Sequence, residues 1–144
     1  MVICADTSFL FSLYGNDANS PAAVAWTSTA TRPITLSPYN SYELGNALRF
    51  SECRQFIQPG EFARSWAQFE AAIRQGRLIT PPCNLADVLD KATRLSATHT
   101  LTKGHRTFDI LHVAAALVLG ATEFLSFDGN QRTLALAEGL DLPL

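Results

Sequence analysis

The stretch of residues 106–131 constrains the fold most, because it holds one carboxylate at each end of a helix-to-strand unit. Residues 110–119 are apolar apart from one histidine and rich in Ala and Leu, which predicts a core helix with little polar face. The glycine that follows predicts a helix stop, and residues 124–127 are typical of a short buried strand. A helix that runs into a strand of a parallel sheet lies antiparallel to that strand. Asp109 and Asp128 are therefore expected at the same edge of a sheet.

Apolar runs and helical spacings alternate along the rest of the chain. Further strands are predicted at 2–5, 34–36, 78–80 and 140–144. Further helices are predicted at 9–14, 21–31, 39–49, 62–73, 85–95 and 131–137, with a polar loop at 98–106. Strands that alternate with helices in this order predict an α/β fold, in which helices flank a central, mostly parallel sheet.

The length and composition fit a single domain over residues 1–144, large enough to bury one substantial core. Hydrophobic residues make up 47% of the chain and charged residues 17%, which argues against disorder. The net charge of −2 provides no global attraction to a polyanion. Any contact with nucleic acid must therefore come from local Arg and Lys clusters or from bound cations.

The amino-terminal sequence and the cysteines predict a reduced, cytoplasmic protein. The first residues lack the basic segment and long apolar run of a signal peptide, and no apolar stretch reaches membrane-spanning length. Three cysteines, Cys4, Cys53 and Cys83, are an odd number without C-x-x-C spacing, so neither a disulfide framework nor a zinc site is indicated. We interpret Cys4 as a small core residue of the first strand.

Four acidic residues occupy positions that solvation at the surface does not explain. Asp6 and Asp128 each follow an apolar strand directly. Asp109 begins an apolar helix, and Glu43 lies early in a helix that follows a strand. In an open parallel sheet the carboxyl ends of the strands and the N-termini of the covering helices share an edge, where ligand sites form. The four carboxylates are therefore predicted to converge. The remaining acids fit a solvated surface: Asp17, Glu52, Glu61, Glu70, Asp87, Asp90, Glu123, Glu138 and Asp141.

Four ionised carboxylates in one pocket repel one another unless a cation lies between them. The chain has no His or Cys cluster at ligand spacing, so ligation by oxygen favours Mg²⁺ or Mn²⁺ over zinc. Such ions can activate water, clamp a phosphodiester oxygen and stabilise the leaving alkoxide. The acidic pattern therefore favours metal-dependent phosphodiester hydrolysis.

Four segments of the chain together resemble those of a known family. They are ADTSFL with Asp6, SYELGNALRF with Glu43, RTFDILHVAAAL with Asp109, and FLSFDGNQRTLA with Asp128. In order and spacing they resemble the PIN-domain ribonucleases, and within these the toxins of the virulence-associated type II toxin–antitoxin systems. The resemblance implies a PIN-like three-layer sandwich, an Mg²⁺ or Mn²⁺ site built from the four acids, and cleavage of RNA. It also implies a homodimer and neutralisation by a cognate antitoxin.

Polar residues near the four acids are candidates for holding the ligands and their waters in orientation. These candidates are Ser8, Asn46, Thr107, Ser126 and Asn130. For Ser8 and Thr107, helix capping is an equally good explanation. His112 lies three residues beyond Asp109 on the same helical face. We interpret His112 as a core histidine rather than a general base, because a metal-bound water needs no separate imidazole.

Basic residues near Asp109 are candidates for phosphate contacts that would position RNA. Arg106 is the first candidate and Lys103 the second. Arg49 and Arg132 lie on predicted helices that could border the pocket. For each of these residues, a solvated position or an ion pair with the acidic cluster explains its presence equally well.

The main alternative function is that of a catalytically silent PIN-like module that acts through antitoxin and operator assembly. The complete set of four acids argues against it. A magnesium-dependent phosphatase of the haloacid-dehalogenase kind needs a second carboxylate two residues after Asp6, where Ser8 stands. A response-regulator receiver needs paired acids after the first strand. We therefore predict a metal-dependent endoribonuclease toxin.

Overall fold

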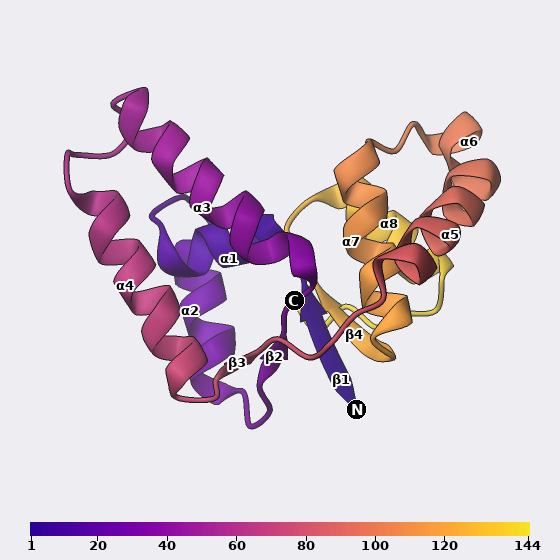
Figure 1. Ribbon diagram of the computed structural model, residues 1–144, viewed down its shortest axis with the longest axis horizontal. Helices are drawn as coiled ribbons and strands as arrows, with labels where there is room; N and C mark the ends of the chain where they lie inside the picture. Colours follow the sequence, from indigo (N-terminus) through magenta and orange to yellow (C-terminus); the bar gives the residue numbers. More distant parts are fainter.

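The computed structural model describes all residues, Met1–Leu144, and places a parallel four-stranded sheet at the centre. The strands are β1 (Val2–Ala5), β2 (Ile34–Thr35), β3 (Leu78–Ile79) and β4 (Ala121–Leu125), in the spatial order β3-β2-β1-β4. β1 pairs in parallel with β2 on one side and with β4 on the other. The first strand of the chain is therefore internal to the sheet, and Figure 1 shows it between two groups of helices.

The helices cover both faces of the sheet (Figure 1). One group consists of α1 (Thr7–Tyr14), α2 (Ser20–Thr29), α3 (Pro38–Cys53) and α4 (Glu61–Arg74). The other consists of α5 (Leu85–Leu95), a π-helical turn η1 (Ser96–Thr100), α6 (Leu101–Lys103), α7 (Thr107–Val118) and α8 (Gly129–Ala137). The predicted helices are present, with ends shifted by about one turn or less. None of them combines the length and apolar character that a membrane-spanning helix needs.

Alternating side chains of the strands divide the core into two parts. In β1, Ile3 and Ala5 pack against the α1–α4 group, whereas Cys4 packs against α5, α7 and α8. In β4, Leu125 joins the first part of the core and Phe124 the second. Successive residues of a strand point to opposite faces, so the sheet is buried on both sides. This confirms the α/β three-layer sandwich with a parallel sheet. Burial also raises the pKa of the Cys4 thiol to about 12, as its predicted core position requires.

β4 begins and ends earlier than the predicted strand at 124–127. It spans Ala121–Leu125 because it pairs with β1, whose last residue, Ala5, lies opposite the last residue of β4. Beyond that point the chain leaves the sheet. The Ser126 hydroxyl bonds a carboxylate at the end of β1, and the Phe127 ring stacks against α1. Ser126 and Phe127, which were predicted as the end of the strand, therefore lie at the edge of the sheet where the acids meet.

Two other segments also differ from prediction. Residues 140–144 form no strand but a single bridge between Glu123 and Asp141, and the proline in this segment has no amide hydrogen with which to extend the pairing. The segment 98–106 is not a loop throughout, because its polar side chains are compatible with the helical turns η1 and α6. The helical path is broken at 104–106, where Gly104 has a left-handed φ of +68° and Arg106 is extended.

Candidate active site

The four acids singled out by the sequence meet at the edge of the sheet where the parallel strands have their carboxyl ends. Asp6 follows β1 and caps α1, and Asp128 caps α8 shortly after β4. Asp109 lies in the first turn of α7, and Glu43 lies in the second turn of α3. All four side chains line one open pocket. The structure brings these carboxylates together, and their role as metal ligands stays a prediction.

Asp6 is the most buried of the four carboxylates, with 3% of the residue exposed. It accepts hydrogen bonds from the Ser126 hydroxyl at 2.6 Å, the Ser8 hydroxyl at 2.7 Å and the Phe9 amide at 2.8 Å. Burial raises the pKa of the Asp6 carboxyl, and the three donors act in the opposite direction. Water solvates the Asp6 carboxylate poorly, and the three hydrogen-bond donors stabilise its charged form in place of water.

Replacing Asp6 by asparagine is expected to leave the stability of the metal-free protein unchanged or to raise it. The amide removes a buried charge and can still accept from the Phe9 amide, while the Ser126 hydroxyl can donate instead to the Gln131 side chain, 3.2 Å away. Asp6→Ala removes the cap of α1 and should cost about 1 kcal/mol. Urea unfolding in EDTA measures both variants. An asparagine variant as unstable as the alanine variant would contradict this expectation.

Two of the five residues predicted to orient the ligands bond a carboxylate directly. Ser8 and Ser126 both donate to Asp6, at 2.7 Å and 2.6 Å. The Ser126 hydroxyl also accepts from the backbone amide of Asp128 at 3.1 Å. Because Asp6 follows β1 and Asp128 follows β4, this one hydroxyl links the two acidic strand ends.

The other three candidates lie further from the acids. Asn46 and Thr107 line a neighbouring hollow that shares only two of the four acids with the pocket. No side-chain hydrogen bond caps α7, so the capping role considered for Thr107 is not observed. Asn130 donates to the Gly104 carbonyl at 3.3 Å. It therefore holds the loop before α7 and makes no bond to a predicted ligand.

Arg106 lies between two of the acids. Its Nε donates to Asp109 Oδ2 at 2.9 Å, and its Nη2 is 3.9 Å from Asp128 Oδ2. The hydrogen bond to Asp109 raises the pKa of Arg106, which keeps the guanidinium charged. The Arg106 side chain is 76% exposed, so these ion pairs contribute little to stability and can be broken at small cost. Arg106 can thus either neutralise the acids or turn toward a phosphate.

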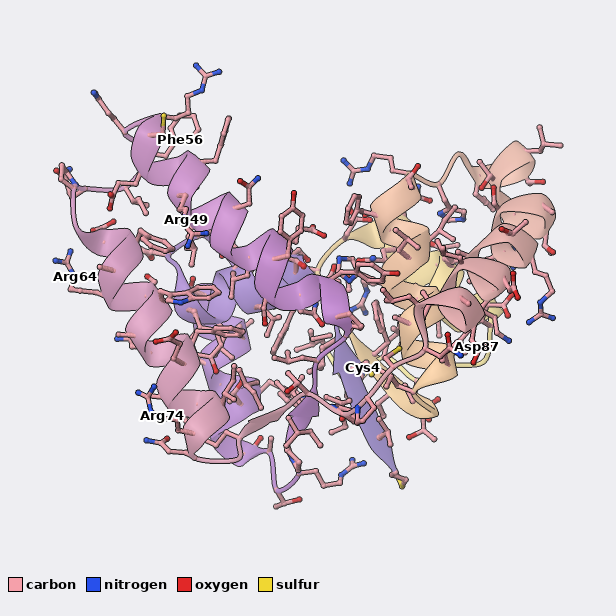
Figure 2. The ribbon with its side chains drawn as sticks, in the orientation of Figure 1. Cys4, Arg49, Phe56, Arg64, Arg74 and Asp87 are labelled. Atoms are coloured by element: carbon pink, nitrogen blue, oxygen red, sulfur yellow. The ribbon has the colours of Figure 1, made fainter.

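The other basic candidates do not face the acids. Lys103 is exposed at the end of α6 and is not among the residues that line the pocket. Arg49 lies between α3 and α4 (Figure 2), with its guanidinium 4.5 Å from the centre of the Phe62 ring. Arg132 donates to the Ser126 carbonyl at 3.0 Å. Of the basic residues considered, only Arg106 stands at the pocket.

The pocket is also lined by polar residues that the sequence had not marked, among them Gln131 and Asp17. The backbone amide of Gln131 donates to Asp128 Oδ1 at 2.8 Å, and its side-chain amide donates to the Asp109 carbonyl at 3.1 Å. Its position three residues after a capping Asp is a signal that the sequence did contain. Asp17, predicted as a solvated surface residue, is exposed but lines the same pocket and accepts from Ser12 at 2.8 Å. The loop that returns Asp17 to this edge has no pattern that predicts its path.

The pocket fits a hard divalent cation in its chemistry, because all four acids offer the oxygen ligands that Mg²⁺ and Mn²⁺ prefer. No three of the chain's His, Cys, Asp and Glu side chains already form a cluster that could hold an ion. Arg106 bonds Asp109, and His112 bonds Glu43. An ion would take over the contact that Arg106 makes with Asp109, so its binding requires the Arg106 side chain to move, whereas the His112 bond occupies only Oε2 of Glu43.

His105, in the loop before α7, is expected to make stability depend on pH. The residue is buried, and neither ring nitrogen has a hydrogen-bond partner. Burial and the neighbouring His99 lower its pKa, against the opposing effect of Asp109 and Asp128. As the pH falls through the ordinary value of about 6.5, the unfolded chain takes up a proton before the folded chain does, and stability is lost.

The variant His105→Leu lacks this proton uptake. Its melting temperature should therefore fall less than that of the wild type between about pH 7.5 and about pH 5.5. Thermal unfolding of the two proteins in matched buffers measures the difference. Because the acids of the pocket are present in both proteins, their own titration cancels in the comparison. An equal fall in the two proteins would show that His105 titrates normally.

The fold is the three-layer sandwich that the sequence resemblance implies, and the four acids line one pocket. The PIN domain family model matches residues 3–136, which is almost the whole chain. This chain therefore belongs to the PIN domain family.

Solved structures that share its fold include the following two. The first is Mycobacterium tuberculosis VapC20, described as a toxin that cleaves the sarcin–ricin loop, with 20% identity, coverage of 91% of this chain and 93% of that chain, and a TM-score of 0.69. The second is VapBC2 from Rickettsia felis bound to a DNA fragment from its promoter, with 15% identity, coverage of 99% and 97%, and a TM-score of 0.63. At these identities the likeness concerns the fold. No protein of curated function matches the sequence.

Proposed function

We propose that this PIN domain is a metal-dependent endoribonuclease and the toxin of a type II toxin–antitoxin pair. The observation that carries the proposal is the convergence of four acids, contributed by distant parts of the chain, on one pocket. Helix capping accounts for Asp6 and Asp128. It does not account for Glu43, which lies past the first turn of α3 and caps nothing, yet lines the same pocket.

In this mechanism the acids Asp6, Glu43, Asp109 and Asp128 would hold Mg²⁺ or Mn²⁺. When bound, the ion polarises the scissile phosphodiester and lowers the pKa of the attacking water. The hydroxyls of Ser8 and Ser126 keep the Asp6 carboxylate in place through bonds of 2.7 Å and 2.6 Å. Arg106, released from Asp109, would contact a phosphate oxygen and set the register of the RNA backbone.

The proposed partners are an RNA substrate, a cognate antitoxin and a second copy of the chain in a homodimer, in the cytoplasm. VapC20, which shares the fold, is described as cleaving the sarcin–ricin loop, and this supports RNA as the substrate class. The VapBC2 structure supports an antitoxin partner. The net charge of −2 means that the affinity for RNA would depend on the ion and on Arg106 rather than on an overall positive surface.

The proposal is tested by incubating the purified, antitoxin-free protein with total cellular RNA in Mg²⁺, Mn²⁺ or EDTA and mapping the ends produced. Discrete cuts with either ion, and none in EDTA, are expected. The protein should keep its fold in EDTA, as judged by circular dichroism, because its core does not involve the pocket acids. Cleavage that persists in EDTA would contradict metal dependence, and no cleavage with either ion would contradict the nuclease.

The second candidate function is a PIN module that acts by binding DNA together with an antitoxin. It is favoured by one observation, namely that the VapBC2 complex is bound to promoter DNA. A gel-shift experiment with the co-expressed antitoxin and its own promoter region tests this function. Promoter binding by a protein that does not cleave RNA would favour the binding module. Promoter binding by a protein that also cleaves RNA is compatible with the toxin.

A further inference from the structure

His112 projects from α7 into the same pocket as the acids. It is buried, with 3% of the residue exposed, which confirms the core position predicted for it. Its Nε2 lies 2.8 Å from Glu43 Oε2 and 3.3 Å from Thr7 Oγ1. Its other ring nitrogen, Nδ1, is buried and has no partner. The bond to Glu43 joins the two helical layers of the fold, since it links α7 to α3 beside the end of β1.

These contacts determine which nitrogen of His112 carries the proton. An ionised carboxylate can only accept, so Nε2 must donate to Glu43 Oε2 across the 2.8 Å that separates them. Nδ1 has no hydrogen-bond partner. The other tautomer would place two acceptors against each other at Nε2 and would bury the Nδ1 hydrogen unpaired, at a greater cost. The structure therefore selects a ring with a hydrogen on Nε2.

The His112 ring is held much more firmly than the carboxylate it bonds. It packs edge-on to the Tyr39 ring at 6.4 Å and lies 6.5 Å from the Phe108 ring. The Glu43 side chain is 35% exposed and, without a partner, has several rotamers open to it. A bond from the fixed ring removes that freedom. It occupies one carboxylate oxygen, Oε2, and leaves Oε1 available for a ligand.

We propose that His112 is a positioning residue of the metal site, which acts by holding the Glu43 carboxylate in the orientation that a divalent cation requires. The inference rests on the proposed function, because Glu43 is a ligand only if the pocket binds the ion. Residues that orient a metal ligand through a hydrogen bond typically change metal affinity by 10–100-fold when they are removed. A histidine that only filled the core would leave metal affinity unchanged wherever the fold survives.

Three substitutions separate the hydrogen bond from the packing. In His112→Gln the side-chain amide can reach the position of Nε2 and donate to Glu43, whereas in His112→Asn the shorter amide reaches only the position of Nδ1. His112→Phe fills the volume without a donor. Mn²⁺ binding to each variant is measured by calorimetry, and circular dichroism checks the fold. We expect the Kd for Mn²⁺ to rise about 10–100-fold in the Asn and Phe variants, with most of this loss recovered in the Gln variant.

A double-mutant cycle shows whether His112 acts through Glu43. In the Glu43→Ala background, changing His112 to Asn should produce no further change in the Kd for Mn²⁺, because the coupling is lost with its partner. Independent, additive losses would overturn the inference, as would a folded Asn or Phe variant with wild-type affinity. Should the Phe variant fail to fold, the Gln and Asn pair decides the question alone. Failure of the wild type itself to bind Mn²⁺ would overturn the proposed function and this inference with it.

Discussion

Replacing Asp109 by asparagine is expected to lower the rate of metal-dependent RNA cleavage by more than about 100-fold, with the fold retained. Loss of residues that merely orient metal ligands costs up to about 100-fold, so loss of a ligand charge should cost more. Stability should change little, because the one side-chain bond that Asp109 accepts comes from Arg106, which is 76% exposed. Single-turnover cleavage of a defined RNA, in saturating Mn²⁺, gives the rate.

A matched control is provided by Asp87→Asn, which changes the same residue type in the first turn of another helix. Asp87 lies on α5, and Figure 2 shows it on the opposite side of the molecule from the α3–α4 hairpin. It is exposed and does not line the acidic pocket. Its variant should cleave at the wild-type rate. If Asp109→Asn cleaved as fast as Asp87→Asn, the pocket could not be the catalytic site.

The positions of the acids could be predicted because they follow from backbone geometry alone. Asp6 and Asp128 come after apolar runs, and in a parallel sheet all strands end at one edge. Asp109 could be placed at the same edge because α7 must run antiparallel to the strand that it precedes. None of these steps requires knowledge of where a side chain points.

The contacts between the acids and their neighbours could not be predicted in the same way. Ser126 bonds Asp6 across 120 positions of sequence, and His112 bonds Glu43 across 69. Such pairs depend on the rotamers of both partners and on how far the helices are displaced from one another, which no local pattern records. The predicted limits of β4 were wrong for a related reason. β4 ends where its partner β1 ends, so its length is a property of the pairing and not of its own residues.

Phe9→Ala is expected to lower the free energy of unfolding by about 3–5 kcal/mol, the largest stability effect predicted for this chain. Phe9 is fully buried, and its ring packs 5.8 Å from Phe127 and 5.9 Å from Trp26. Removing the ring leaves a cavity and breaks two aromatic contacts together. Urea unfolding measures the change, with Phe56→Ala as the control.

The control isolates burial as the cause, because Phe56 has the same side chain but is 74% exposed and lies beyond the end of α3 (Figure 2). Its truncation should change stability by no more than about 0.5 kcal/mol. The cavity at Phe9 also lies beneath the acidic edge, since the Phe9 amide bonds Asp6 and the Phe127 ring precedes Asp128. Phe9→Ala should therefore weaken Mn²⁺ binding even at temperatures where the variant is folded. A variant that lost stability but bound Mn²⁺ as well as the wild type would show that the strand ends keep the acids in place without this packing.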